Sequence, residues 1–324
     1  MLNLITGGAG FLGSHLVDAL VDRGDRAIVV DNVSTGHVRN LEHGLSSGRA
    51  TFVYADVAVP YPRLAEIVAN ATKAKIDRIY HLASPGGPQA YRNDPWGTLA
   101  VNGLATMSLI ELALEHGARF LFASSAAVYA DPLVHPQTES DGGNVAALGP
   151  RSAYDEGKRF GEAAVAAAVR SRALDGRIAR LFNCYGPGID RDGDGLVPAL
   201  IDALLEGNPL PIHGNGRQRR SLLYVDDAVE LIVLAMESVA RALAPIDVGS
   251  DDERSVEEIA RTLVGIAGMT NAPFAHLPAR LDDPRRRRPD LTRAASLGWS
   301  PSTGLADGLR ATYNWVREAR LVFA

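Results

Sequence analysis

A glycine-rich turn near the N-terminus constrains the fold of this chain more than any other feature. The segment from Thr6 to Gly13 reads Thr-Gly-Gly-Ala-Gly-Phe-Leu-Gly, after an apolar stretch and before a helical pattern. This order predicts a strand, a tight turn and a helix whose first amides can bind a pyrophosphate. We expect Gly7 to permit the turn, Gly10 to let the backbone approach the phosphates, and Gly13 to let the helix pack on the strand. A plain strand-to-helix connection is the alternative.

The same alternation continues along the first half of the chain. Strand candidates lie at residues 2–5, 27–30, 51–54, 79–81, 120–123 and 178–182, and helical patterns at 13–23, 64–73, 96–116 and 153–173. Such βαβ units predict an α/β fold with a doubly wound parallel sheet, a Rossmann domain. After Asn183 the composition shifts to Gly, Pro and Asp, which indicates a smaller C-terminal lobe. We expect this to be a substrate-binding lobe. We expect the main domain at 1–182 with a return segment near 226–248, and the lobe at 183–225 and 249–324.

Charge and cysteine content narrow the class of protein. The 324 residues carry a formal net charge of −5, which argues against general nucleic-acid binding. Cys184 is the only cysteine, so intrachain disulfides and multi-cysteine metal sites are excluded, and we expect no metal. We find no apolar run near the ~20 residues of a membrane span and no signal-peptide pattern. We therefore expect a cytoplasmic protein without a membrane or nucleic-acid partner.

Two aspartates follow predicted strands where a dinucleotide would lie. Asp31 ends the second strand, where its carboxylate can accept from both ribose hydroxyls and would repel a 2′-phosphate, so we expect NAD rather than NADP. Asp56 follows the third strand and is placed to meet the adenine edge. Both have a simpler alternative, because aspartate is also common as a cap or in turns.

Tyr154 and Lys158 form the predicted catalytic pair. They are four residues apart at the start of a predicted helix, so both side chains lie on one face. A phenol with a pKa near ~10 is a poor base, but a nearby ammonium stabilises the phenolate. Tyr154 can then take a proton from a substrate hydroxyl. Ser125 follows the fifth strand and can share that hydrogen bond. The alternative, a pair of surface residues, would hold if Tyr154 and Lys158 stood alone.

In chain order these motifs resemble the extended short-chain dehydrogenase/reductases that act on nucleotide sugars, over essentially the whole chain. The motifs are Thr6 to Gly13, His81-Leu82-Ala83, Ser124-Ser125, and Tyr154 with Lys158. Longer strings resemble UDP-glucuronate decarboxylases, namely Asp31-Asn32 with Thr35-Gly36, Ala83-Ser84-Pro85, residues 154–159, and Asp282-Asp283-Pro284 with Arg287 and Pro289-Asp290. The resemblance implies NAD and a UDP-sugar, and it favours a sugar with a carboxylate at C6. The cofactor site it implies comprises Gly7, Gly10, Phe11, Leu12, Gly13, Asp31, Asn32, Ser34, Gly36, Asp56, Val57, Leu82, Ala83, Ser84, Tyr154 and Lys158.

Ala127 departs from the decarboxylase pattern. Those enzymes place a glutamate at this position, and 4,6-dehydratases place an acidic pair here, whereas residues 124–129 read Ser-Ser-Ala-Ala-Val-Tyr, similar to UDP-galactose-type 4-epimerases. In the reaction that the resemblance implies, the sugar is first oxidised at C4 to a 4-keto intermediate. Without an acid at position 127, this intermediate is less suited to lose its C6 carboxylate as carbon dioxide. We therefore expect a UDP-glucuronate 4-epimerase that forms UDP-galacturonate. The alternatives are a decarboxylase forming UDP-xylose, in which Ala127 is drift, and an NAD-binding sensor without turnover, which an intact Tyr154 disfavours.

The remaining expectations concern the substrate and the oligomer. Arg92 and Arg191 are candidates for binding the carboxylate, because an arginine fork matches it bidentately, although solvated loop charges are the alternative. The resemblance implies that the substrate site also contains Pro85, Gly86, Ser125, Ala126, Asn183, Val197, Ile212, His213, Arg220 and Arg287. It assigns Arg220 and Arg287 to the diphosphate, and the basic run 285–288 fits that role. At His213 decarboxylases usually have an aromatic residue. We expect a homodimer through 96–116 and 153–173.

Overall fold

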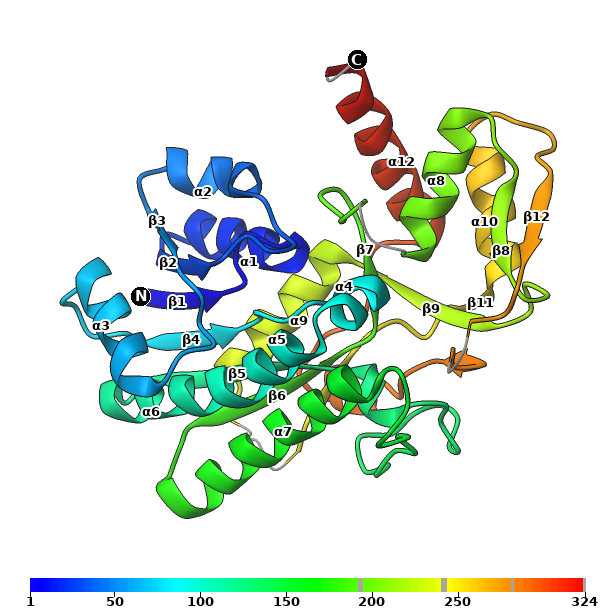
Figure 1. The fold of residues 1–324 in the computed structure, drawn as a ribbon. Helices are drawn as coiled ribbons and strands as arrows, with labels where there is room; N and C mark the ends of the chain where they lie inside the picture. Colours follow the sequence, from blue (N-terminus) through cyan, green and yellow to red (C-terminus); the bar gives the residue numbers. More distant parts are fainter. Residues whose placement is uncertain (192–194, 240–243, 281–282, 323–324) are drawn as a thin grey trace.

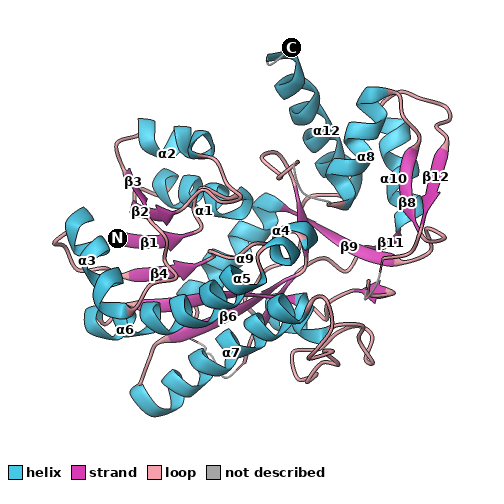
Figure 2. Cartoon of the chain, viewed as in Figure 1, coloured by secondary structure: helices cyan, strands magenta, loops and turns pink. Residues whose placement is uncertain are grey.

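The computed structural model describes residues 1–191, 195–239, 244–280 and 283–322. Within this part of the chain, seven parallel strands form the central sheet in the order β10-β6-β5-β4-β1-β2-β3 (Figures 1 and 2). The strands are β1 (Leu2–Thr6), β2 (Arg26–Asp31), β3 (Ala50–Tyr54), β4 (Arg78–His81), β5 (Arg119–Ser125), β6 (Gly176–Leu181) and β10 (Ile246–Val248). The predicted doubly wound sheet is confirmed, and the return segment supplies β10. The strands up to β3 lie on one side of β1 and those from β4 onward on the other, and such folds bind ligands at this change of strand order between β1 and β4.

Helices cover both faces of the sheet. One buried core contains side chains of α1 (Phe11–Asp22) and α9 (Val225–Glu237). The other contains side chains of α3 (Tyr61–Ala71), α6 (Thr106–His116) and α7 (Ser152–Arg172). Short segments complete this domain at Val38–Leu41, α2 (Glu42–Ser46), α4 (Pro88–Asn93) and Ala126–Tyr129.

The expected helix at 96–116 differs in the structure. It consists of α5 (Pro95–Ala100), a π-helical segment Val101–Ala105, and α6. Pro95–His116 is also long and apolar enough to cross a membrane by length and composition, so our expectation that no segment reaches that size was wrong here. Half of its most apolar window is buried inside the protein. A core helix has the same character, so this is weak evidence for a span.

The second lobe has its own sheets and core. β7 (Asn183–Tyr185), β9 (Arg219–Tyr224), β11 (Glu253–Ser255) and β13 (Arg286–Arg287) form one sheet, and β8 (Leu210–His213) pairs with β12 (Phe274–Leu277). These strands lie beside α8 (Leu196–Glu206), α10 (Val256–Ile266) and α12 (Leu305–Val322) (Figure 1). α11 (Thr292–Ser296) and Trp299 instead contribute to the core under α1 and α9. The domain boundaries stay a prediction.

Close packing between α7 and β5 depends on a glycine, and this packing yields a stability prediction. A Cβ on Gly161 would lie 2.3 Å from Cζ of the buried Phe122. Gly161→Ala should therefore lower the free energy of unfolding by about 1–3 kcal/mol, despite the better helix propensity of alanine. Urea unfolding measures the change.

The control is Gly265→Ala in α10, where a Cβ meets nothing within 4 Å. This variant should gain up to about 1 kcal/mol. Equal stability of the two variants would contradict the packing of α7 on β5.

Candidate active site

The glycine-rich turn lies against the loop that follows β4. Gly7 has a φ of +73°, and a Cβ there would lie 2.6 Å from the backbone nitrogen of Ala83. A Cβ on Gly13 would lie 2.1 Å from the carbonyl oxygen of Gly7. Both positions therefore require glycine. The turn leaves a backbone-lined cradle at the start of α1 that any side chain on Gly7 or Gly13 would disrupt, and this fits a dinucleotide pyrophosphate.

Asp31 holds this turn from the end of β2. Its carboxylate accepts from the backbone nitrogens of Ala9 at 2.9 Å and Val33 at 2.7 Å. The structure thus shows the turn-bracing alternative, and the ribose contact stays a prediction. Asn40, which the sequence did not suggest, donates to the Ala9 carbonyl at 2.9 Å, and a Cβ on Gly36 would lie 2.5 Å from the same oxygen.

The other predicted adenosine residues lie close to one another. Asn32 donates to Asp56 at 3.3 Å and accepts from the Ser34 backbone at 3.1 Å. Asp56 also accepts from Ala58 at 2.8 Å, which is the turn role considered as its alternative. Val57 packs in the core beneath the sheet. Asp56 therefore combines a turn function with a position next to Asn32.

Two buried polar residues support the loop after β4: Asn102, which the sequence did not suggest, and His81, which the sequence analysis named only as part of a motif. Asn102, in the π-helical segment, donates to the Ser84 hydroxyl at 3.1 Å. His81 hydrogen-bonds Thr6 at 2.8 Å and Thr106 at 3.1 Å. Burial, with the nearby charge of Lys158, lowers the pKa of His81 to about 3, so the ring is neutral. A single asparagine in an otherwise apolar stretch was the available signal.

The three predicted catalytic residues meet at the carboxyl end of β5. Tyr154 lies in the first turn of α7, and Lys158 follows one turn later. The Lys158 ammonium donates to the Ala123 carbonyl at 2.8 Å and lies 5.7 Å from the centre of the Tyr154 ring. Ser125 hydrogen-bonds Tyr154 and accepts from the Ala127 backbone at 3.1 Å. The arrangement suits proton transfer at the phenol oxygen.

Burial and charge act in opposite directions on this pair. Burial raises the pKa of Tyr154, while the Ser125 hydrogen bond and the positive charges of Arg287 and Arg151 lower it. Burial lowers the pKa of Lys158 to about 7, and Glu162 opposes this shift. The positive charges around Tyr154 favour its phenolate.

A second tyrosine covers Tyr154. The Tyr91 ring stacks on the Tyr154 ring with centroids 5.0 Å apart and an interplanar angle of 17°. Tyr91, Tyr154 and Ala127 form one buried cluster. Aromatic rings therefore pack against position 127, where decarboxylases would place a glutamate. The sequence reasoning selected the neighbouring Arg92, which is exposed on the short helix α4, not in a loop, and donates to the Pro88 carbonyl at 2.9 Å.

Two arginines lie near Tyr154. Arg151 precedes α7, forms an ion pair with Asp155 at 3.4 Å, and lies 5.7 Å from the centre of the Tyr91 ring. The Nε and Nη2 atoms of Arg287 are buried and have no hydrogen-bond partner among the described residues. Burial and the charges of Arg151 and Arg220 lower the pKa of Arg287 to about 10. An anion at this place would complete the site.

The basic run divides in the structure. Arg285 pairs with Asp131 and Arg286 with Glu253, both at the surface, while Arg287 is directed into the site. Arg220 donates to Asp283 at 2.7 Å. Asp282 of the same motif lies outside the described residues.

The second lobe holds the other predicted substrate residues. Arg191 pairs with Asp202 of α8 at 2.7 Å, and Arg320 of α12 contacts the same oxygen. Val197 and Ile212 are buried in the lobe core. His213 hydrogen-bonds the Pro278 carbonyl at 3.0 Å. The Asn183 side-chain oxygen is buried and has no partner among the residues described. These substrate roles stay predictions.

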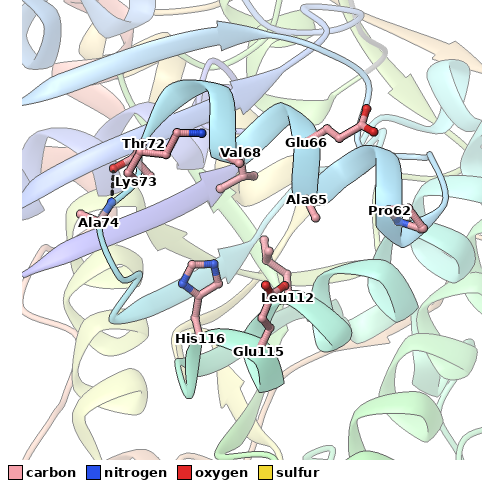
Figure 3. A pocket seen from close by; sticks show the side chains of 11 residues that line it. Pro62, Ala65, Glu66, Val68, Thr72, Lys73, Ala74, Leu112, Glu115 and His116 are labelled. Carbon is pink, nitrogen blue, oxygen red and sulfur yellow. Dashed lines mark hydrogen bonds between the residues drawn. The ribbon is translucent and has the colours of Figure 1, made fainter.

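A pocket of about 380 Å³ lies elsewhere, between α3 and the end of α6 (Figure 3). Pro62, Val68, Lys73, Leu112 and His116 are among its lining residues. None of the predicted catalytic, cofactor or substrate residues lines it, so we do not assign it to the active site.

Comparisons with known proteins agree with this geometry. The model of the NAD dependent epimerase/dehydratase family matches residues 3–249. UDP-glucuronic acid decarboxylase 1 of Xenopus tropicalis is 38% identical over 97% of this chain and 72% of its own length. UDP-glucuronic acid decarboxylase 6 of Arabidopsis thaliana is 39% identical over 94% of this chain and 86% of its own.

A solved structure adds a neighbour with a different activity. UDP-glucuronic acid 4-epimerase from Bacillus cereus, in complex with UDP-glucuronic acid and NAD, has a TM-score of 0.85 and 27% identity, and covers 98% of this chain and all of its own. The fold thus agrees with that of this neighbour over nearly the whole chain. The chain therefore belongs to the NAD dependent epimerase/dehydratase family of extended short-chain dehydrogenase/reductases, and its cofactor is NAD.

Proposed function

We propose that this enzyme acts on UDP-glucuronate and oxidises the sugar at C4. The observation that carries this proposal is the pair Arg151 and Arg287 near Tyr154, with buried donor atoms of Arg287 that have no hydrogen-bond partner in the described part of the chain. An arginine guanidinium is suited to a carboxylate or a diphosphate, and a UDP-uronate supplies both. Curated relatives over 94–97% of the chain are UDP-glucuronic acid decarboxylases.

In the proposed reaction Tyr154 takes the proton of the 4-hydroxyl, while Ser125 hydrogen-bonds the same region of the sugar. Bound NAD would supply the redox chemistry, as the acceptor and then the donor of the C4 hydride. Lys158 stabilises the phenolate form of Tyr154, which accepts this proton. The resulting 4-keto uronate is a β-keto acid.

For the fate of this intermediate we propose decarboxylation to UDP-xylose. The C5–C6 bond breaks and carbon dioxide leaves, while the electron pair of that bond moves toward the C4 carbonyl. C5 is then protonated before C4 is reduced again. Similarity over nearly the whole chain to enzymes named as decarboxylases supports this outcome better than the epimerase that Ala127 led us to expect.

A 4-epimerase is the second candidate, and a specific observation favours it. Ala127 is packed with Tyr91 and Tyr154, so position 127 offers no carboxyl group to the keto sugar. In that reaction the carboxylate stays on C6 and hydride returns to the opposite face of C4. The Bacillus cereus epimerase is a structural neighbour with this activity.

The product from UDP-glucuronate and NAD tests these proposals. We expect proton NMR and mass spectrometry to find a UDP-pentose and released carbon dioxide, with Tyr154→Phe as the inactive control. A sugar of unchanged mass with an altered C4 coupling would establish the epimerase instead. If neither product forms, both proposals are contradicted.

We assign the contact with the sugar carboxylate to Arg151. Substitution of Arg151 should therefore have an effect that depends on the substrate. Arg151→Met should lower kcat/KM for UDP-glucuronate about tenfold or more, since a charge-assisted hydrogen bond contributes about 1.5–3 kcal/mol. Affinity for UDP alone should change little. Arg92→Met is the matched control, because that arginine is exposed on α4. An equal loss for UDP and UDP-glucuronate would assign Arg151 to the diphosphate.

We also propose a homodimer through the helical layer of α5, α6 and α7. Exposed apolar side chains gather on these elements and the π-helical segment between them, namely Trp96, Leu99, Leu104, Met107 and Phe160. α5 and the π-helical segment pack beside α7, with Gly103 next to Phe160. An isologous contact would cover this surface on both copies.

Light scattering should therefore find a dimer, and Met107→Glu with Phe160→Glu should produce a folded monomer, because two carboxylates would be buried at the contact. Leu148→Glu, on an exposed loop, is the control and should remain dimeric. A wild-type monomer across a dilution series would overturn the proposal.

A further inference from the structure

A hydrogen-bond network of polar side chains, from Ser124 through Glu162, Arg180 and Tyr129 to Asp247, lies next to the catalytic pair. Glu162 accepts from the Ser124 hydroxyl at 2.5 Å and from Arg180 at 2.8 and 2.7 Å. Arg180 donates to the Tyr129 hydroxyl at 2.8 Å, and that hydroxyl donates to Asp247, whose two oxygens lie at 2.8 and 2.9 Å. These residues come from α7, β5, β6, the turn after β5, and β10. The reaction described above uses none of them.

Glu162 is the residue of this network that faces Lys158. It follows Lys158 by four residues in α7, so both side chains lie on the same face of the helix. Both also reach consecutive residues of β5, Lys158 through the Ala123 carbonyl and Glu162 through the Ser124 hydroxyl. Both groups are therefore held on the same face of α7 against β5, and the charge of Glu162 acts on the buried ammonium.

Among the described residues, the other titratable groups around Lys158 do not supply a negative charge. Tyr154, on the same helix, is a phenol at rest, and His81 of β4 is neutral because of its lowered pKa. Arg180 of β6 is positive and is held by Glu162. Glu162 is the carboxylate that opposes the effect of burial on the pKa of Lys158, which lies at about 7.

We propose that Glu162 is a positioning residue that keeps Lys158 protonated during catalysis, and that Arg180, Tyr129 and Asp247 fix its orientation. The inference rests on the proposed function for the role of Lys158 as the cation beside Tyr154. The bidentate Arg180 contact removes the rotational freedom of the carboxylate. Ser124, adjacent to the catalytic Ser125, connects that carboxylate directly to β5.

The sign of the effect follows from the protonation equilibrium. The protonated form of Lys158 is lost as pH rises through its pKa. Glu162→Gln removes the negative charge and leaves the Arg180 charge uncompensated, so both changes disfavour the ammonium. The alkaline limb of kcat should therefore move down by about one pH unit, a tenfold loss of turnover on that limb, with little change at lower pH.

Two glutamate variants provide the controls. Glu162→Asp keeps the charge at a shorter reach, so its limb should lie between those of the wild type and Glu162→Gln. Glu156→Gln, on the same helix with a half-exposed side chain, should leave the profile unchanged. Far-UV circular dichroism checks the fold of each variant. If Glu162→Gln does not fold, the position of the Glu162→Asp limb decides the question.

The pH dependence of NAD affinity, followed by tryptophan fluorescence, separates this inference from the choice of sugar. Lys158 is also expected to contact the cofactor, so the alkaline loss of NAD binding should move in the same direction in Glu162→Gln, even if UDP-glucuronate is not the substrate. Unchanged limbs in both measurements, or an activity loss that is uniform across pH, would overturn the proposal.

Discussion

The contact between the glycine-rich turn and the loop after β4 is the constraint on which the rest of the site depends. β1 and β4 are neighbours in the sheet although β2 and β3 separate them in sequence, so their loops leave the sheet in opposite directions and open a crevice. Gly7 and Ala83 approach so closely that no side chain fits between them. Asp31 and Asn40 hold the turn in this position from the side of β2.

Burial of charged and polar groups then determines the chemistry at the end of β5. Lys158 is buried, and its ammonium has the Ala123 carbonyl, the Tyr154 ring and the nearby Glu162 charge as surroundings. A buried ammonium without such partners would lose its proton readily. The hydrogen-bond network from Ser124 through Glu162, Arg180 and Tyr129 to Asp247 meets the same requirement, because buried polar groups are stable only when they are hydrogen-bonded. The same burial raises the pKa of Tyr154, and the arginines around it act in the opposite direction.

Arginines in the sequence have different roles according to their burial. Arg92 and Arg191 were the sequence candidates for binding the carboxylate. In the structure Arg92 is exposed on α4, and Arg191 pairs with Asp202 in the second lobe. Arg151 and Arg287 converge near Tyr154 from α7 and β13. Their meeting depends on the return of the chain from the second lobe toward the main domain, which brings residues 136 positions apart to one place.

The sequence by itself determined the Rossmann sheet and the glycine cradle. It also determined the place of Asp31 at the end of β2 and of Tyr154 and Lys158 on one helix face near Ser125. These features depend on local spacing: a strand period, a turn that only glycine permits, and two side chains one helical turn apart. Tertiary structure alone decided the partners of Lys158, the stacking of Tyr91 on Tyr154 beside Ala127, and which arginines reach the site. Those contacts join α4, β5, β13 and α7, and no local pattern of side chains specifies which distant segment fills the space beside a given residue.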